Sequence, residues 1–449
     1  MMRVRFFSKT AYFVGSPALL HEIFVDKAKS FGKTGMMRYM LYPVAGEGLF
    51  TSNGALWRQQ RKLMSPLFTQ RDVARYAGCM VDCALRGAST WGDGETVDMA
   101  RETMRITMSI AGRALFEAET FDEADALGAA LTVALDWASH NAGNPVPLLQ
   151  NALRRGLEDI SGRLPSRLRQ PTRDLAGALH GPVLLPTPRA RRLQAAVHVL
   201  DDRVQRMIDE RRATPGAHSD LLTRLLSARD EDDGSRMSDK QVRDEVLTLF
   251  IAGHETTATA LAWSLYLLAR HPEALRRVQA EVDALGGRPP TFQDYPRLAY
   301  TLQVFKETLR LYPPVYFFSR EAMTDVDVAG HVLPRGTILF FSPFATHRRP
   351  DLWKDPERFD PERFKPEAEG SRPRLSWFPF GAGPRVCIGN HFALVEGTLV
   401  LATLLGKARF ELVRAGEAEL EPSATLRPRD GMPMRIHRRQ PQDAAARVA

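Results

Sequence analysis

Cysteine is scarce in this 449-residue chain, which contains only Cys79, Cys83 and Cys387. So few thiols exclude a disulfide framework and fit a reducing, cytoplasmic compartment. Cys79 and Cys83 are four residues apart, so we expect both to pack on one helix, and no histidine lies near them in the sequence to complete a metal site. Cys387 has no neighbouring thiol and needs a different explanation.

Long uninterrupted apolar runs are also missing. Residues 246–269 are long enough to cross a bilayer, but His254, Glu255 and several threonines interrupt their centre. An ionisable group at that depth in lipid is costly. We therefore expect a helix through the core of a large protein, and no integral membrane anchor.

The chain also lacks segments of concentrated charge. The net charge of +8 comes mostly from arginines scattered along the chain. No aromatic-plus-basic pattern points to nucleic acid, so nucleic acid binding is not expected. A modest basic balance can instead attract an acidic protein partner.

Most of the chain has the pattern of helices. Ser238 and Gln241 form a capping-box pair that begins a helix predicted to run to Arg270, where His271 and Pro272 end it. Further helices are predicted over 272–287 and 300–311. Alternating or β-branched segments predict short strands near 11–15, within 325–343 and over 408–413. The predicted fold class is mainly α with small β-sheets.

Residues 140–190 have the composition of an irregular, loop-rich segment. The prolines of this stretch are at 145, 147, 165, 171, 182, 186 and 188, and its arginines include those at 154, 155, 163, 167, 169 and 173. A solvated basic surface is the simplest interpretation, and a docking patch is the alternative.

The stretch FPFGAGPRVCIGN, residues 378–390, surrounds Cys387 with glycines at 381, 383 and 389. Glycine allows turns and close approaches that side chains would block. A tight loop of this kind suits a thiolate presented to a metal, and Arg385 could pair with an anionic group of the same ligand. A structural cysteine in a glycine-rich loop is the alternative.

The loop resembles the haem-ligand loop of the cytochrome P450 family, F-x-x-G-x-R-x-C-x-G. The matching positions are Phe380, Gly381, Gly383, Arg385, Cys387 and Gly389. The resemblance extends along nearly the whole chain and implies a single domain over 1–449. It implies haem b between a long oxygen-binding helix and the cysteine loop, with Cys387 as the axial thiolate that ligates the metal.

Two further segments carry the resemblance on the same side of the cofactor. Glu307 and Arg310, in KETLRLYPP, are three residues apart on a helix and can pair on one face. Arg363, in FDPERF, completes a Glu-Arg-Arg network in the family. We expect these three residues to support the fold and not to react.

The AGHETT segment at 252–257 resembles the family's oxygen-binding motif. Ala252 and Gly253 are small enough for a flat cofactor to lie against the helix, while Thr256 offers a hydroxyl and Glu255 an acid. A hydroxyl and an acid linked through water can relay protons to bound oxygen. Glu255 stands where the family often has aspartate. A polar kink in a core helix is the structural alternative.

Trp57 and Arg61 are one helical turn apart, so the indole N–H and the guanidinium can point to one anion. The resemblance implies that this pair holds a haem propionate, and that Arg320 and Arg385 are further propionate partners. Positively charged side chains around the two propionates would offset the cost of burying these carboxylates.

The implied reaction is monooxygenation, in which one oxygen atom of O2 enters an apolar small molecule by hydroxylation or epoxidation. No flavin domain or cysteine cluster follows Cys387, so NAD(P)H electrons are expected from a separate ferredoxin and ferredoxin reductase, or a diflavin reductase. The protein is expected to be a cytoplasmic monomer. The predicted pocket wall combines Leu249, Val315, Tyr316, Phe317 and Met432, and core packing explains these residues as well.

The resemblance has two weak places. The first strand and helix, AYFVGSPALLHEIFVDKA, begin about ten residues into the chain, so the start is expected to be shortened relative to the family. Residues 140–185, the part that usually covers the substrate channel, are expected to be enlarged. The substrate is therefore not predictable from the sequence.

Three other functions compete with monooxygenation. A peroxygenase would use hydrogen peroxide on the same scaffold, although the Glu255–Thr256 pair favours O2. A haem-binding gas sensor would share the cofactor but lack turnover. A structural protein without haem would purify colourless.

Overall fold

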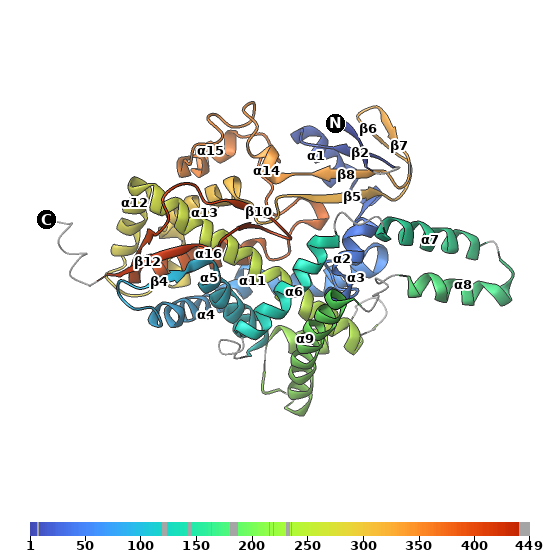
Figure 1. Cartoon of the computed structure of the whole chain (residues 1–449), viewed down its shortest axis with the longest axis horizontal. Helices are drawn as coiled ribbons and strands as arrows, with labels where there is room; N and C mark the ends of the chain where they lie inside the picture. Colours follow the sequence, from blue (N-terminus) through green and yellow to red (C-terminus); the bar gives the residue numbers. More distant parts are fainter. Residues whose placement is uncertain are drawn as a thin grey trace.

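The computed structural model describes residues 1–6, 9–118, 124–141, 146–162, 164–179, 187–214, 216–218, 220–229, 234 and 236–439. Helices form the body of the molecule, and a sheet that contains the N-terminal strands lies at one end (Figure 1). The predicted fold class, mainly α with small β-sheets, is confirmed.

Helices account for most of the described chain. Their bounds are α1 (Pro17–His21), α2 (Gly35–Ala45), α3 (Gly54–Met64), α4 (Gln70–Ser89), α5 (Met99–Ile110), α6 (Ala124–Asn141), α7 (Val146–Ser161), α8 (Ser166–Ala178), α9 (Pro188–Ala213), α10 (Leu221–Ser227), α11 (Asp239–Arg270), α12 (Pro272–Asp283), α13 (Ala299–Leu311), α14 (Pro343–Thr346), α15 (Pro366–Ser371) and α16 (Asn390–Lys407). The helices predicted after Ser238, Pro272 and Tyr300 are therefore present as α11, α12 and α13.

The larger sheet has the order β1–β2–β8–β5–β3, in which β2 and β8 are parallel and the other pairs antiparallel. Its strands are β1 (Met2–Phe6), β2 (Lys9–Phe13), β3 (Phe31–Gly32), β5 (Phe318–Ala322) and β8 (Ile338–Phe341). A second sheet has the order β4–β12–β9, and two small hairpins pair β6 with β7 and β10 with β11. The bounds of these strands are β4 (Thr96–Asp98), β6 (Val326–Val328), β7 (His331–Leu333), β9 (Ala408–Leu412), β10 (Leu420–Pro422), β11 (Leu426–Pro428) and β12 (Pro433–Arg438).

Helix α11 runs through the core, as its apolar composition predicts. The Ser238 hydroxyl accepts from the Gln241 N–H at 3.3 Å, and the Gln241 side chain accepts from the Ser238 N–H at 2.8 Å, so the predicted capping box begins the helix. α11 packs against α5, α13 and α16, so its apolar residues face protein on several sides. Among the described residues, no helix combines the length and apolarity needed to cross a bilayer.

The expectation of an irregular segment over 140–190 is wrong for the described residues, because α7 and α8 occupy most of it. Proline here marks helix starts: Pro147 is the second residue of α7, Pro165 is the N-cap of α8, and Pro188 opens α9. The first turn of a helix tolerates proline, since its N–H groups have no partner within the helix. Pro171 lies inside α8. Residues 142–145, 163 and 180–186 lie outside the described residues.

Candidate active site

The loop that carries Cys387 is shaped by two glycines. Gly383 has a φ of +65°, and a Cβ there would lie 1.7 Å from the carbonyl oxygen of Phe24. Gly381, with a φ of +69°, makes the preceding turn. Only glycine fits both requirements at position 383. The Cys387 N–H donates to the Phe380 carbonyl at 2.8 Å, which closes the loop and fixes the thiol.

The protein environment of the Cys387 thiol opposes its ionisation. Its side chain is exposed by surface area, yet protein atoms surround it closely enough that burial raises its pKa. The Gly389 N–H and the Arg61 guanidinium oppose this rise. Gly389 itself has an ordinary φ of −94°, so it serves through its N–H and not through a turn. A desolvated thiol of this kind is deprotonated by binding a metal cation.

One face of α11 is accessible in the interior where the rest of the helix is buried. Ala252 is exposed and Gly253 and Thr256 are half-buried, whereas their helix neighbours Ile251, His254 and Glu255 are buried. The Thr256 hydroxyl donates to the Ala252 carbonyl at 2.7 Å. α11 packs against α16, the helix that begins three residues after Cys387. The small residues therefore leave room for a flat group next to the helix.

Glu255 points away from Thr256. Its carboxylate accepts from the Thr425 hydroxyl at 2.7 Å and lies 3.7 Å from the Arg427 Nε. Both side chains of the predicted relay are described, and no hydrogen bond joins them directly. A relay through this pair therefore requires water or a rotation of Glu255.

A cluster of cations lies beside the cysteine loop. Burial, followed by the charge of Arg385, lowers the pKa of Arg320 to about 10. Burial likewise lowers the pKa of Arg385 to about 10, and the Nη1 atom of Arg385 is buried without a hydrogen-bond partner. A buried guanidinium with an orphaned N–H indicates an anionic partner.

Lys33 belongs to the same cluster, and the sequence analysis missed it. Its Nζ donates to the backbone carbonyls of Leu49 and Ser52. Burial lowers its pKa well below the usual range, and the nearby charges of Arg385 and Arg320 lower it further. No motif distinguishes this lysine in FGKTGMM, because its burial depends on residues far apart in the chain.

Trp57 and Arg61 are both near the cysteine loop but have separate partners. The Arg385 guanidinium lies over the Trp57 ring, 4.1 Å from its centroid. The Arg61 Nη1 donates to the Val386 carbonyl at 2.9 Å. The structure therefore links each residue to the loop, and their joint contact with one propionate stays a prediction.

This set of residues fits haem b. Cys387 supplies one thiolate for an iron atom, and α11 offers a surface of small residues for a flat ring. Arg320 and Arg385 supply positive charge for two propionates, and the orphaned Nη1 of Arg385 is a donor ready for one of them.

Glu307 and Arg310 form a fully buried, bidentate ion pair. Arg310 Nε lies 2.6 Å from Glu307 Oε2, its Nη2 lies 2.8 Å from Oε1, and both side chains are 0% exposed. Arg363 Nε lies 3.5 Å from Glu307 Oε1, which assembles the predicted three-residue network. Arg310 also donates to the backbone carbonyls of His347, Pro356 and Arg358. The network therefore connects α13 to residues 347–363, the segment that precedes the cysteine loop.

His347 continues this network to the cysteine loop. Its Nε2 accepts from the Phe378 N–H at 2.9 Å. Burial, with the charge of Arg310, lowers its pKa to about 3, so the ring is neutral and can accept. The sequence analysis did not identify His347, because the contact joins segments 31 residues apart.

Glu396 is another buried polar residue that the sequence analysis missed. It lies on α16 at 1% exposure, and burial raises its pKa well above the usual range, partly offset by a hydrogen bond with Thr257 of α11. This environment therefore favours the neutral form of the carboxyl group. It joins α16 to the helix that carries Thr256.

The predicted pocket residues do not share one environment. Leu249 and Met432 are buried in the main core, and the Tyr316 hydroxyl donates to the Ser423 carbonyl at 3.0 Å. Phe317 is 39% exposed, and its ring packs on Phe13 and Phe340 at the larger sheet. We therefore leave Phe317 out of the proposed pocket, and the others, including the half-buried Val315, stay predictions.

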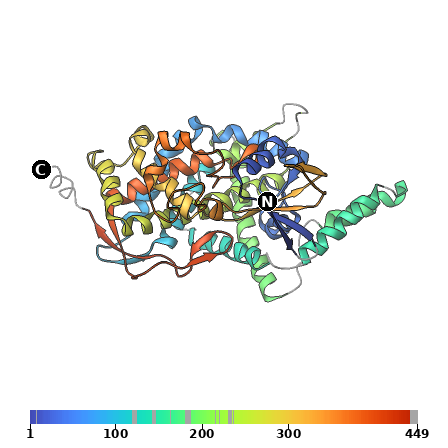
Figure 2. The same cartoon turned by 90° about the horizontal axis from the view of Figure 1, so that it is seen from above.

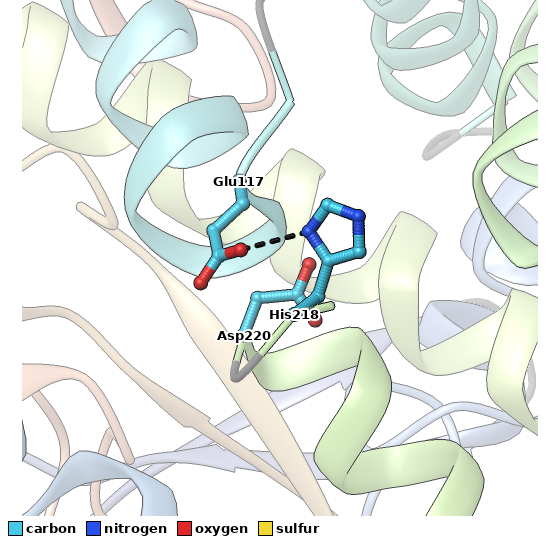
Figure 3. Close-up of side chains that lie close together, drawn as sticks. All are labelled: Glu117, His218 and Asp220. Carbon is cyan, nitrogen blue, oxygen red and sulfur yellow. Dashed lines mark hydrogen bonds and ion pairs between the residues drawn. The ribbon is translucent and has the colours of Figure 1, made fainter. Parts of the chain in front are cut away.

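Glu117, His218 and Asp220 lie close together away from this site (Figure 3). His218 Nδ1 is 2.9 Å from Glu117 Oε2. The Asp220 carboxylate, however, already accepts from buried Arg211 at 2.6 Å and 2.8 Å and caps α10 at the Thr223 N–H. Because a buried guanidinium competes with a metal ion for that carboxylate, we assign the group a structural role.

Substitution of Arg320 tests the propionate assignment. Arg320→Gln is expected to speed haem loss to excess apomyoglobin about tenfold or more, because a charge-assisted hydrogen bond is lost. Arg414→Gln is the matched control, since Arg414 is exposed and pairs with exposed Asp430. Equal rates of haem loss for both variants would contradict the assignment.

Comparisons with known proteins agree with this geometry. The family described as Cytochrome P450 matches residues 1–164 and 168–433. Cyclooctatin synthase of Streptomyces melanosporofaciens is 33% identical, covering 96% of this chain and 86% of that protein. Pentalenene oxygenase of Streptomyces avermitilis is 34% identical, covering 95% and 86%. The crystal structure of a cytochrome P450DA haem domain is similar with a TM-score of 0.82 at 27% identity, covering 98% of this chain and 90% of that one.

Proposed function

The chain belongs to the cytochrome P450 family and is a haem-dependent monooxygenase, and from this premise we propose that it oxygenates an apolar, terpene-like hydrocarbon skeleton. The observation that carries the proposal is the closed Cys387 loop, which leads into α16, the helix that packs against α11 with its accessible small residues. Electrons come from NAD(P)H through separate redox proteins.

Haem b supplies oxygen activation when bound, and the protein residues arrange it. With haem bound, Cys387 would hold the iron as a thiolate, and Arg320 and Arg385 would neutralise the propionates. The Thr256 hydroxyl, on the accessible face of α11, is placed to hold a proton donor near the reacting oxygen. Glu255 supplies protons through water after leaving Thr425.

The substrate class is proposed from the relatives and the wall residues. Two relatives are named for oxygenation of pentalenene and cyclooctat-9-en-7-ol, and each is 34% identical to this chain. Half-buried Val315 offers apolar surface for a hydrocarbon of this kind, and buried Leu249 and Met432 would have to become accessible to join it. An apolar pocket with few polar groups suits a terpene skeleton.

The redox partner is proposed to be an acidic ferredoxin. α3 carries Arg58, Arg61 and Lys62, and Arg61 contacts the cysteine loop directly. Arg58 and Lys62 are exposed on the same helix. Positive charge next to the thiolate loop favours a negatively charged electron donor.

Isotope labelling tests the proposal. The haem-loaded protein is incubated with NADPH, a surrogate ferredoxin and reductase, a panel of terpene hydrocarbons and ¹⁸O2. We expect products that contain one ¹⁸O atom by mass spectrometry. Product formation from hydrogen peroxide alone, with none from ¹⁸O2 and NADPH, would assign the protein as a peroxygenase. If no terpene of the panel is oxidised with either O2 and NADPH or hydrogen peroxide, the proposed substrate class is wrong.

Removal of the Thr256 hydroxyl tests the proton relay. Thr256→Val is expected to lower product formation about 100-fold, since general acid catalysis contributes at least that factor. Thr403→Val is the control, because Thr403 is buried on α16 and its hydroxyl, like that of Thr256, donates to a backbone carbonyl four residues earlier. The haem spectra of both variants are expected to match the native protein. Unchanged turnover in Thr256→Val would exclude the hydroxyl from the relay.

A further inference from the structure

Helices α7 and α8 form a hairpin that projects from the body of the molecule. Figure 1 shows the two helices extending beyond the end of the larger sheet, and the perpendicular view shows the same projection (Figure 2). α7 and α8 pack on each other, and α7 contacts α2 near the base. Much of the surface of both helices is therefore available to solvent.

The hairpin exposes large aliphatic side chains in a helical pattern. On α7, Leu149, Leu153 and Ile160 are 69%, 57% and 52% exposed. Their spacing of four and seven residues places them on one face of the helix. On α8, Leu168 and Leu175 are seven residues apart and are each 54% exposed. Each helix thus presents an apolar stripe away from its neighbour.

Among the residues whose side chains the structure describes, the buried ones in the hairpin are polar or small. Gln150 is 9% exposed, and its side chain donates to the Leu179 carbonyl at 2.9 Å, which links α7 to the end of α8. Ser161 and Ala176 are also buried. Burying a glutamine while exposing leucines is unfavourable if the hairpin contacts only water. Exposed apolar surface of this extent is typical of an interaction site.

The charge of the hairpin indicates which partner fits. Residues 146–178 contain six arginines and three acidic residues. Arg167 and Arg169 are exposed on α8, next to exposed Leu168. Arginines beside an apolar stripe are typical of helices that lie in the interface of a membrane with anionic lipids.

We propose that the α7–α8 hairpin docks on an anionic lipid bilayer, with the leucine stripes entering the boundary between headgroups and acyl chains. The arginines contact lipid phosphates from the flanks of the stripes. This contact is peripheral, since none of the helices that the structure describes could span the bilayer. The inference does not depend on the proposed substrate or redox partner.

Vesicle flotation of the full-length, haem-loaded protein tests the proposal. We expect binding to vesicles of mixed phosphatidylglycerol and phosphatidylcholine that weakens as salt is added, and much weaker binding to phosphatidylcholine alone. The double variant Leu153→Glu, Leu168→Glu is expected to reduce partitioning about tenfold or more, because two apolar anchors are lost. Arg167→Gln with Arg169→Gln is expected to reduce it about fivefold or more on the anionic vesicles only.

Val413→Glu is the matched control, because Val413 is 46% exposed in the bend directly after β9 and is not part of the hairpin. It is expected to bind anionic vesicles like the native protein, and all variants are expected to keep the native haem spectrum and melting temperature. Native binding by the double leucine variant, or no vesicle binding by the native protein, would overturn the proposal. A native dimer in sedimentation velocity that the leucine variant dissociates, without vesicle binding, would instead assign the hairpin to a second copy of the chain.

Discussion

Cys387→Ser is expected to abolish the strongly red-shifted Soret band that the reduced, carbon monoxide-bound native protein should show. A serine hydroxyl does not ionise under the conditions that allow a thiolate, and it gives the iron much less electron density. Product formation is expected to fall by more than about 100-fold, since even residues that merely orient metal ligands contribute 10- to 100-fold. The measurement is a reduced carbon monoxide difference spectrum together with turnover of the best substrate.

Cys83→Ser is the control for this result, because Cys83 is a buried cysteine of α4, outside the cysteine loop. It should keep the red-shifted band, although packing around it can lower stability. A red-shifted band in Cys387→Ser would exclude Cys387 as the ligand. The native protein would also exclude Cys387 as the ligand if its reduced, carbon monoxide-bound Soret band lay at the shorter wavelength typical of histidine ligation.

Arg310→Ala is expected to lower the free energy of unfolding by about 3–5 kcal/mol, the usual result of leaving one member of a buried ion pair alone. Glu307 would keep its burial, which already raises its pKa, and lose the guanidinium that opposes this rise. Three backbone carbonyls would also lose their donor. The change is measured as the shift in urea midpoint of the haem-loaded protein by circular dichroism.

Two variants make the Arg310 result specific. Arg310→Lys keeps the charge but not the bidentate fork, so it should be destabilised by nearly as much. Arg276→Ala removes an arginine from an exposed pair with Glu273 and should have little effect. If Arg310→Ala and Arg276→Ala unfold at the same urea concentration, the buried network does not hold the fold together.

Sequence patterns predicted the site best where the chemistry is local. The cysteine loop needs glycine at position 383, because this residue has a positive φ and lies against the Phe24 carbonyl. The loop motif therefore reflects a local backbone conformation. Glu307 and Arg310 pair across one helical turn, so their spacing predicts the contact. In both cases the interacting atoms are close in the chain.

The predictions were weaker where distant segments meet. Lys33 and His347 lie within the buried networks beside the cofactor site, yet neither stands in a motif. The relay from Glu255 to Thr256 through water stays a prediction, and spacing did not indicate that the Glu255 carboxylate contacts Thr425 and Arg427, immediately before and within β11. Proline content over 140–190 suggested loops, although several of the prolines open helices.

The sequence by itself determined the thiolate loop, the buried Glu307–Arg310 pair, the long core helix and hence the family and its cofactor. These features depend on interactions within one turn or one loop, which residue spacing encodes directly. Only the tertiary structure decided which cations lie beside the cysteine loop, where Glu255 points, and that α7 and α8 project with leucines exposed. Burial and charge neighbours arise from the packing of segments far apart in the chain, and spacing does not record them.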